Sequence, residues 1–403
     1  MEKILDLIKL EEKRQEETLD FIPSENIVSK DVLTAIGSVL TNKYAEGKVG
    51  ARYYQGNEIV DQIEQTTIDL AKKVFGAKFI NVQALSGSPS NLAVYTALLN
   101  VGDKILGFDI RSGGHLTFGQ KISLSGKLFD SHFFSVNKDT EILDYDEVLQ
   151  VAKEVQPKLI VCGTSAYPRD FDWKRLKEIA DSVGAYLLAD ISHTAGLIAS
   201  GFQNSPIGIA NVVTSTTHKT LRGPRGALIM TNEEELSQKI DRAVFPGLQG
   251  GPHLNTIAGI GVALEEAFLP YFKTYASQVI KNAKALVETL SKHGFRIVTG
   301  GTDNHLVLVD LRNKNISGIE AAVRLEKVGI ITNANLIPFD PNPPKNPSGV
   351  RFGTPSVTTR GLKEKEMIIV ASWINDVVSN RSDPKSLENV EREVLKMCSE
   401  FQI

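Results

Sequence analysis

Lys219 has the surroundings that most favour chemistry in this sequence. It lies near the end of residues 212–220, which begin with two valines and continue with small hydroxyl residues and a histidine. With histidine counted as neutral, Lys219 is the only charged residue from 201 through 221. Desolvation would lower the pKa of such a lysine and give a neutral amine that forms an imine with an aldehyde. The alternative is a lysine at a strand end whose amine reaches water.

Asp190 is the second candidate. It ends the apolar run 185–189, and His193 follows three residues later. Open α/β sheets bind ligands at the carboxyl ends of their strands. A carboxylate there can pair with a protonated ring nitrogen, and the histidine can reach the same ligand. An aspartate that caps the next turn is an equally ordinary interpretation.

A third feature is the run of small residues Ser86, Gly87 and Ser88, which leads into an apolar segment that begins at Asn91. Free backbone N–H groups at a helix start form a phosphate cradle, and the helix dipole favours the anion. The segment lacks the Gly-Lys-Ser/Thr of a Walker loop. An ordinary helix N-cap is the competing interpretation.

Together these three features indicate pyridoxal phosphate, because the cofactor needs a phosphate site, an acid for its pyridine nitrogen and a lysine amine on one framework. Asp190 would keep the nitrogen protonated, so that the ring can take up electrons from the α-carbon of an amino acid. His115, after the turn Gly113-Gly114, could stack on a flat ring or be a satisfied turn histidine. Arg351 could bind a substrate carboxylate through its planar fork or form a structural ion pair.

The elements that must position these groups alternate between helix and strand from about residue 60 to 270. We expect helices over 60–75, 91–100 and 173–183, and buried strands over 104–108, 159–162 and 185–190. This alternation predicts an α/β domain with a mostly parallel sheet covered on both faces.

A smaller α/β domain is expected at the carboxyl end, and an arm at the amino end. The predicted domains are 1–57, an N-terminal helix and extended arm that reach a partner subunit; 58–272, the large domain; and 273–403, the small domain. The small domain is expected to contain helices over 277–293 and 318–327, strands over 296–299, 305–310 and 350–352, a proline-rich loop over 335–349, and two terminal helices.

Composition excludes several classes of protein. The 403 residues are 42% hydrophobic and 23% charged with a net charge of −3, which is ordinary for a globular protein and gives no general attraction for nucleic acid or anionic membrane. The two cysteines, Cys162 and Cys398, suit a reducing cytoplasm. No metal-binding motif, signal-peptide core or membrane-spanning apolar stretch is evident.

The sequence closely resembles the serine hydroxymethyltransferase family from about residue 5 to the C-terminus, in order and with matching spacing. The matching stretches are 24–26 (SEN), 40–47 (LTNKYAEG), 52–54 (RYY), 113–117 (GGHLT), 165–167 (SAY), 216–221 (TTHKTL), 223–226 (GPRG), 245–247 (FPG), 249–252 (QGGP), 301–305 (GTDNH) and 351–355 (RFGTP).

This resemblance implies a fold-type-I transferase that uses pyridoxal 5′-phosphate, with a mostly parallel seven-stranded type of sheet and active sites shared in a homodimer or tetramer. Lys219 would hold the cofactor as a Schiff base, Asp190 would pair with the pyridine nitrogen, and His115 would stack on the ring. The other implied cofactor positions are Ser165 and His193 near the ring hydroxyl, Ser86, Gly87, Ser88 and His218 at the phosphate, and Gly251 from the partner subunit.

The implied reaction moves the hydroxymethyl carbon of serine to tetrahydrofolate or a related reduced pterin and yields glycine. Glu46 would transfer a proton beside the serine hydroxyl and the pterin. The implied substrate positions are Ser24, Tyr44, Glu46, Tyr54 and Arg351, and the implied pterin positions are Glu46, Ile110, Gly114, Leu116 and Asn335.

The sequence departs from the family pattern around the phosphate and pterin positions. The family usually has Pro-His where Ala84-Leu85 stands and Gln-Ala where Pro89-Ser90 stands, and it often has histidine at Ser112 and Phe118. Two alternatives therefore stay open. One is a pterin-independent aldolase or transferase on a related β-hydroxy amino acid, and the other is a catalytically silent relative that serves as a binding or scaffold protein.

Overall fold

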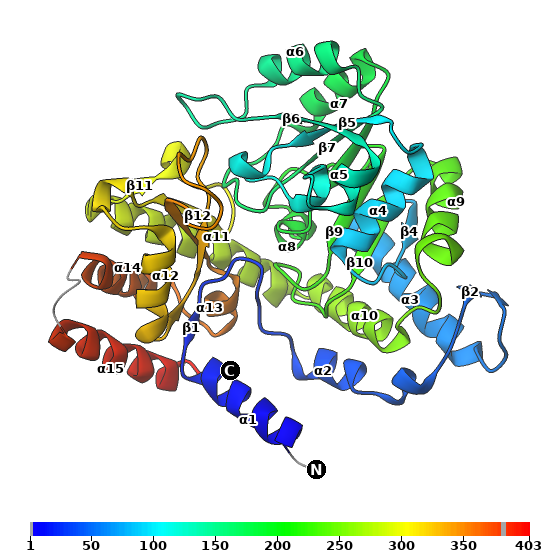
Figure 1. The fold of residues 1–403 in the computed structure, drawn as a ribbon. Helices are drawn as coiled ribbons and strands as arrows, with labels where there is room; N and C mark the ends of the chain where they lie inside the picture. Colours follow the sequence, from blue (N-terminus) through cyan, green and yellow to red (C-terminus); the bar gives the residue numbers. More distant parts are fainter. Residues whose placement is uncertain (1–2, 380–383) are drawn as a thin grey trace. The chain divides into compact units, whose positions relative to one another are not determined.

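The computed structural model describes residues 3–379 and 384–403 (Figure 1). The chain forms two compact units. Unit 1 takes the chain up to Ile27, the short stretch Ala166–Arg169 and the chain from Ser277 onward, and unit 2 takes Val28–Ser165 and Asp170–Ala276. The domain boundaries expected after residues 57 and 272 stay predictions.

Unit 2 contains a seven-stranded sheet within the described residues, in the order β4-β10-β9-β8-β7-β5-β6. β10 pairs antiparallel with both of its neighbours, and the remaining pairs are parallel. The strands are β4 (Phe79–Asn81), β5 (Lys104–Phe108), β6 (Asp130–Phe134), β7 (Leu159–Gly163), β8 (Tyr186–Asp190), β9 (Val212–Thr216) and β10 (Ala227–Thr231).

Helices cover this sheet where the sequence predicted them. The segment 173–183 is observed as α7 (Trp173–Ser182), and 60–75 as α3 (Glu58–Phe75). The side chain of Asp172 accepts a hydrogen bond from the N–H of Arg175, and this cap fixes the start of α7. The other helices of unit 2 are α2 (Lys30–Ile36), α4 (Gly87–Leu98), α5 (Leu124–Leu128), α6 (Tyr145–Val155), α8 (Ala195–Ala199), α9 (Glu234–Arg242) and α10 (Leu254–Phe268).

The sequence analysis missed or shifted several of these elements. α2 lies inside the stretch expected to be an irregular arm, and it begins after Ser29, whose hydroxyl accepts from the N–H of Val32. α4 begins four residues before the predicted helix, so Gly87 and Ser88 lie in its first turn. The periodicity begins only at residue 91 because the first turn consists of small polar residues that show no apolar pattern.

Unit 1 is built on a four-stranded antiparallel sheet in the order β11-β12-β15-β14. The chain start contributes a strand of its own, because β1 (Leu19–Asp20) pairs parallel with β13 (Ile330–Ile331). The sheet strands are β11 (Arg296–Ile297), β12 (Leu306–Asp310), β14 (Asn333–Asn335) and β15 (Gly349–Gly353), and the helices are α1 (Lys3–Glu16), α12 (Gly318–Lys327), α13 (Pro355–Thr359), α14 (Glu364–Ser379) and α15 (Pro384–Glu400). α11 (Pro270–Lys292) enters unit 1 from Ser277.

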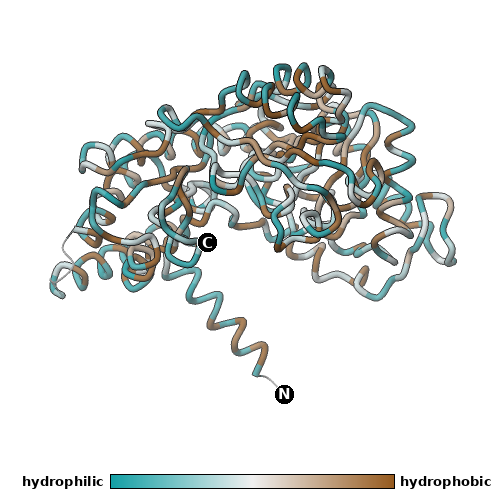
Figure 2. Tube along the Cα trace, turned by 45° about the horizontal axis from the view of Figure 1, so that its top comes forward, coloured by the Kyte–Doolittle hydropathy of each residue, from teal (hydrophilic) through white to brown (hydrophobic). Residues whose placement is uncertain are grey.

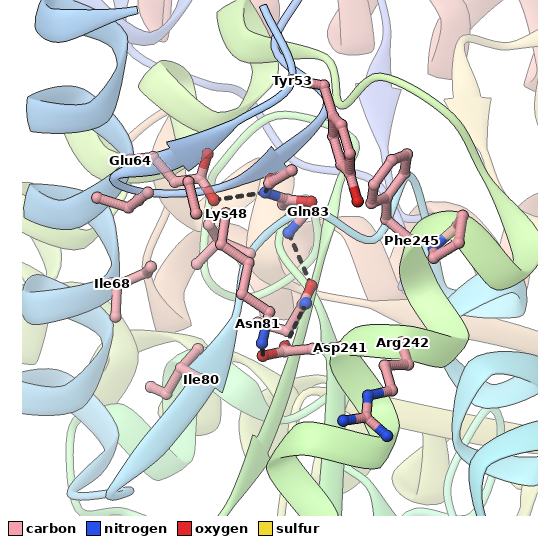
Figure 3. Close-up of a pocket in the computed structure, with 15 residues that line it drawn as sticks. Lys48, Tyr53, Glu64, Ile68, Ile80, Asn81, Gln83, Asp241, Arg242 and Phe245 are labelled. Atoms are coloured by element: carbon pink, nitrogen blue, oxygen red, sulfur yellow. Dashed lines mark hydrogen bonds and ion pairs between the residues drawn. The ribbon is translucent and has the colours of Figure 1, made fainter.

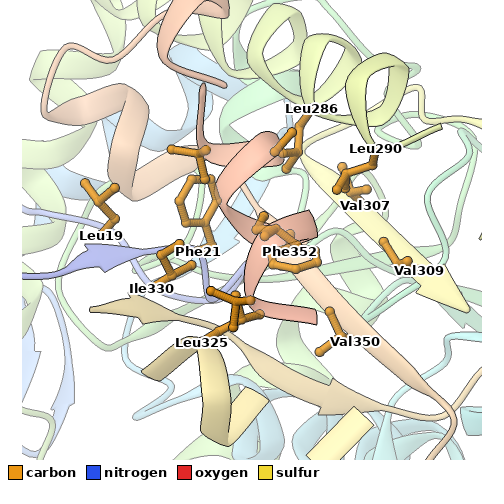
Figure 4. Packing of buried hydrophobic residues seen from close by; sticks show 14 of the residues in the cluster. Leu19, Phe21, Leu286, Leu290, Val307, Val309, Leu325, Ile330, Val350 and Phe352 are labelled. Atoms are coloured by element: carbon orange, nitrogen blue, oxygen red, sulfur yellow. The ribbon is translucent and has the colours of Figure 1, made fainter. Parts of the chain in front are cut away.

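The core of unit 1 joins the two ends of the chain. Phe21 is fully buried, and its ring meets that of Phe352 edge to face with centroids 6.3 Å apart (Figure 4). Arg360 binds five backbone carbonyl oxygens. It donates to Gln15, Glu16 and Thr18 near the start of the chain, and to Cys398 and Phe401 near its end.

None of the residues Lys3–Glu16 of α1 is buried. The apolar residues of this helix lie in its first half, whereas residues 11–16 are all polar (Figure 2). Ile4, Leu5 and Leu10 are each more than 60% exposed. The expectation that this helix lies on a partner subunit stays a prediction.

Replacing Phe21 with alanine tests how strongly the chain start stabilises unit 1. Phe21→Ala should lower the free energy of unfolding by about 3–5 kcal/mol, because it leaves a cavity in a packed core. Denaturant unfolding measures the loss. The matched control is Val101→Ala, at a residue of unit 2 that is 76% exposed, and it should change stability by less than about 0.5 kcal/mol. Equal effects of the two substitutions would contradict the role of Phe21.

The pH dependence of stability tests the half-buried acid Asp20. Burial, reinforced by the neighbouring Glu25 carboxylate, raises the pKa of Asp20 to about 7. Between about pH 4 and 7 the folded chain therefore keeps a proton that the unfolded chain has released, so stability falls as the pH rises through this window.

The variant Asp20→Asn should remove this fall. Its thermal midpoint should match that of the parent near pH 4 and exceed it above pH 7. Asp139→Asn, at an exposed residue of unit 2, is the control and should change neither value. If the thermal midpoints of Asp20→Asn and the parent protein differ by the same amount at every pH, the raised pKa of Asp20 is refuted.

Candidate active site

The Asp190 carboxylate lies at the carboxyl end of β8 and is only 8% exposed. Two donors hold it. The backbone N–H of Ser192 donates to Oδ1 at 3.0 Å, and Nδ2 of Asn91 donates to Oδ2 at 2.8 Å. Donors of this kind replace the water that the side chain loses on burial and so offset the cost of burial. Asp190 is thus a fixed acceptor at the sheet edge where ligands bind.

His115 follows a tight turn that only glycine fits. Gly113 has a φ of 107°, and a Cβ on Gly114 would collide with the carbonyl oxygen of Phe108. The imidazole Nδ1 lies 2.8 Å from Oγ1 of Thr117 and accepts from the Thr117 N–H at 3.2 Å. These contacts fix the orientation of the ring, as a stacking role requires.

The start of α4 lies against the ends of β8 and β9. A Cβ on Gly87 would lie 2.6 Å from Cγ2 of Thr216, so the backbone approaches β9 more closely than any other residue type allows. The N–H of Thr216 donates to Oγ of Ser192 at 2.9 Å. The first-turn N–H groups of a helix lack intrahelical partners and suit an anion. Ser86 is the N-cap residue, but no side-chain cap hydrogen bond is found.

Lys219 follows β9 and is 9% exposed. The next turn is closed by the N–H of Gly223, which donates to the carbonyl of Thr217 at 2.7 Å. His218 is neutral at physiological pH, because burial and the cations Lys219 and Arg225 lower its pKa to about 3. Its Nδ1 is buried and has no hydrogen-bond partner within the described residues. A polar atom so placed is a ready contact for a ligand.

A second cluster gathers on the arm before α3. The Tyr44 hydroxyl donates to Oε1 of Glu46 at 3.0 Å, and this bond raises the pKa of Tyr44. The rings of Tyr44 and Tyr54 meet edge to face with centroids 5.1 Å apart. A Cβ on Gly251 would lie 3.2 Å from the ring of Tyr44. The structure therefore brings together four predicted site residues, among them Gly251, which the resemblance implies serves the partner subunit's site.

Arg52 holds this arm in place. Its side chain is 3% exposed and donates to Oδ1 of Asp61 at 2.8 Å and to Oε2 of Glu64 at 2.5 Å. Nη1 also donates to the carbonyl oxygens of Ala45 and Gly47, which flank Glu46. The planar guanidinium thus donates to two carboxylates and two carbonyl oxygens at once. The single ammonium group of a lysine could not replace this set of hydrogen bonds.

The cavity of about 400 Å³ beside this arm contains none of the predicted site residues (Figure 3). Tyr53 and Phe245 line one side, with ring centroids 5.9 Å apart. Gln83 donates to Oε1 of Glu64 at 2.7 Å. Asp241 accepts from Asn81 and from Lys48. The polar groups that line the cavity are therefore largely paired with one another.

Three predicted positions lie in unit 1. Arg351, on β15, donates from Nε and Nη2 to Oδ1 of Asn333 on β14. Burial lowers its pKa to about 10, so it stays charged at neutral pH. Asn335 ends β14, and Ser24 lies half-buried after β1.

The other predicted positions lie in unit 2. The N–H of Ser165 donates to the carbonyl of Gly113 at 2.7 Å, so Ser165 adjoins the His115 turn. The His193 carbonyl accepts from Oγ1 of Thr220 at 2.9 Å, beside Lys219. Ile110 lies in the short helix η2 (Ile110–Ser112), and Leu116, 46% exposed, follows His115.

The sequence analysis missed Asn91 and Thr117 as site residues. Asn91 is 1% exposed and joins Asp190, Thr117 and Thr214 by hydrogen bonds. The usable signal is a polar amide inside an otherwise apolar helical segment, because such a group is buried only when it has partners.

The fold and the site together define an α/β enzyme of the transferase class. In this enzyme the buried Lys219 follows strand β9 of the large sheet. The family model described as "Serine hydroxymethyltransferase" matches residues 1–374. Three curated proteins named "Serine hydroxymethyltransferase" are each 51% identical to this chain. They come from Aster yellows witches'-broom phytoplasma (99% of this chain, 94% of the relative), Desulfotalea psychrophila (99% and 93%) and Methanosarcina barkeri (100% and 97%). The chain belongs to the serine hydroxymethyltransferase family.

This membership confirms the predicted fold class, a fold-type-I α/β transferase, and the predicted reaction, the interconversion of serine and glycine with tetrahydrofolate. The family uses pyridoxal phosphate. The residues present fit that group: the buried Nδ1 of His218 lacks a partner within the described residues, the Gly87 backbone leaves no room for a side chain, and Asp190 offers a fixed carboxylate. Within residues 3–379 and 384–403, no helix is long and apolar enough to cross a membrane.

Replacing Arg52 with lysine tests whether this residue holds the arm that carries Glu46. Arg52→Lys should lower stability by about 2 kcal/mol through lost hydrogen bonds and should speed limited proteolysis within residues 44–56. Turnover of serine should fall with it. The control is Arg175→Lys, whose ion pairs to Asp146 and Glu178 are exposed and contribute little. A protease-resistant arm in Arg52→Lys would refute this role.

Proposed function

We propose that this chain transfers the hydroxymethyl group of serine to tetrahydrofolate with pyridoxal 5′-phosphate bound at Lys219. The observation that carries the assignment is that two neighbouring strands of unit 2 lead to the required groups: a buried lysine follows β9, and a carboxylate is fixed at the end of β8. When bound, the cofactor supplies an electron sink for the α-carbon of the amino acid. A cytoplasmic location fits two buried, unbridged cysteines.

The residues of unit 2 have separate tasks in this proposal. Lys219 supplies the amine that binds the cofactor aldehyde. Asp190 holds the proton of the pyridine nitrogen. His115 orients the ring by stacking on it. The first turn of α4 and neutral His218 bind the phosphate, since both can present N–H donors to it.

The substrate is bound and deprotonated by other groups. Arg351, assisted by Ser24, binds the amino acid carboxylate through a guanidinium that stays charged. Glu46 moves the proton of the serine hydroxyl as the Cα–Cβ bond breaks. Tyr44 orients Glu46 through the 3.0 Å hydrogen bond between them. Ile110, Gly114, Leu116 and Asn335 are assigned to the pterin by family resemblance.

The lysine assignment is tested by borohydride reduction of the purified protein, followed by peptide mapping. The cofactor should be fixed to the peptide that contains Lys219, and Lys219→Gln should lose both the label and serine turnover. Lys158→Gln, at a side chain that is 58% exposed, is the control and should keep both. A label on another lysine would overturn the assignment.

Serine cleavage measured with and without tetrahydrofolate tests the reaction. The proposal expects glycine formation to depend on the pterin and to fall by about a hundredfold in Glu46→Gln, which removes the proton-transfer group. Equal rates without pterin would instead support an aldolase of a related β-hydroxy amino acid. A labelled Lys219 without any turnover would support a silent relative.

The shared-site homodimer is part of this proposal and rests on the Tyr44, Glu46, Tyr54 and Gly251 cluster. Lys219→Ala and Glu46→Ala chains are each expected to be inactive. Mixed by unfolding and refolding together, they should regain about a quarter of the parent activity, because half of the dimers are mixed and each of these has one intact site. If Glu46 serves its own chain, the mixture stays inactive.

A further inference from the structure

One face of α4 holds the turn that carries His115. Asn91 and Tyr95 lie four residues apart, so their side chains project from the same face of the helix. Nδ2 of Asn91 donates to Oγ1 of Thr117 at 2.9 Å, and the Tyr95 hydroxyl donates to the Thr117 carbonyl at 2.8 Å. Asn91 is 1% exposed and Tyr95 is fully buried. α4 thereby fixes Thr117 by both its side chain and its backbone.

The same amide also holds the acid at the end of β8. One Nδ2 hydrogen of Asn91 bonds Oδ2 of Asp190 at 2.8 Å, while the other bonds Thr117. Oδ1 of Asn91 accepts from the buried hydroxyl of Thr214 at 2.7 Å. Turning the amide over would place its carbonyl oxygen against the Asp190 carboxylate, which is a contact between two acceptors. The hydrogen-bond network therefore determines the orientation of Asn91.

The hydrogens available along this series of hydrogen bonds determine which ring nitrogen of His115 carries the proton. The Thr117 hydroxyl has one hydrogen and already accepts from Asn91, so that hydrogen is free to bond Nδ1 of His115. The backbone N–H of Thr117 also donates to Nδ1. A proton on Nδ1 would face this N–H and would leave the Thr117 hydroxyl with two donors and no acceptor. Each of these donors and acceptors has a partner only when Nδ1 of His115 carries no proton.

We infer that Asn91 and Thr117 are positioning residues that connect Asp190 to His115, orient the carboxylate and keep the proton of the neutral imidazole on Nε2. The inference rests on the proposed function for its consequence, because the two groups so connected are those assigned to the pyridine nitrogen and to the ring face. A shift of Asn91 or Thr117 disturbs both contacts to the cofactor at once.

The wild-type imidazole can be examined directly in protein freed of cofactor. Two-bond ¹H–¹⁵N spectra of histidine-labelled protein, with the His115 signals assigned by their loss in His115→Gln, report which nitrogen carries the proton. The expected spectrum shows an unprotonated Nδ1 and a protonated Nε2. A proton on Nδ1 in the wild type would overturn the inference.

Variants test the connection through Thr117. Thr117→Val removes the hydroxyl at nearly constant volume and should shift the His115 nitrogen signals toward a mixture of tautomers. Thr117→Ser keeps the hydroxyl and should restore the wild-type spectrum. Thr96→Val is the matched control, since its exposed hydroxyl on α4 bonds only carbonyls of the same helix. An unchanged His115 spectrum in Thr117→Val would contradict the connection.

Cofactor affinity gives a second, independent readout through a double-mutant cycle. Asn91→Leu and Thr117→Val should each weaken pyridoxal phosphate binding by about tenfold, the effect of one lost hydrogen bond of this kind. If the two residues act through one another, the loss caused by Thr117→Val should shrink in the Asn91→Leu background. Strictly additive losses of cofactor affinity would refute the connection through Asn91 and Thr117. Circular dichroism confirms that each variant is folded.

These measurements separate the inference from the proposed function. If wild-type protein binds pyridoxal phosphate at Lys219 but the affinity losses of the two variants are additive, the inferred connection is wrong and the proposed function stands. If Lys219 is not labelled, the proposed function fails. The tautomer of His115 in cofactor-free protein still tests the connection through Asn91 and Thr117.

Discussion

The buried carboxylate of Asp190 is the constraint on which the active site depends. A carboxylate that loses water at the end of a strand is costly unless donors replace that water. The chain supplies one donor from its own strand end, the N–H of Ser192, and one from a separate helix, the amide of Asn91. The second contact requires α4 to lie against the ends of β8 and β9, and this packing sets where the turn proposed to bind the phosphate begins.

The same requirement accounts for the small residues around the site. Gly87 lets α4 approach Thr216 on β9, and Gly114 lets the His115 turn approach the carbonyl of Phe108 at the end of β5. Side chains at either place would push apart elements that must converge on Asp190. The steric limits are therefore part of the same arrangement as the hydrogen bonds, and neither explains the site alone.

Much of this arrangement was predictable from the sequence. The strand over 104–108 was predicted with its observed bounds, and Asp190 was correctly expected at a buried strand end. Apolar runs that end in a charged residue give a local signal, so these elements are accessible from sequence. α2 was missed because it has only seven residues and buries only Val32, so it is too short for a helical period to stand out.

The contacts of Asn91 were not predictable in the same way. Asn91 and Asp190 are 99 residues apart, and nothing local indicates which donor finds which acceptor. The family resemblance gave the roles of single residues, but it did not give the connection among Asn91, Thr117 and His115, which depends on tertiary packing.

The guanidinium of Arg360 has a consequence for the order of events during synthesis. It binds carbonyls of residues 15–18 and of residues 398–401, so the contacts that complete unit 1 join segments about 380 residues apart in the sequence. All segments of unit 2 have been translated by Ala276, more than a hundred residues before Phe401. The nascent chain must therefore carry Leu19 and Phe21 without their final partners while the larger sheet forms, and it needs protection from aggregation over that interval.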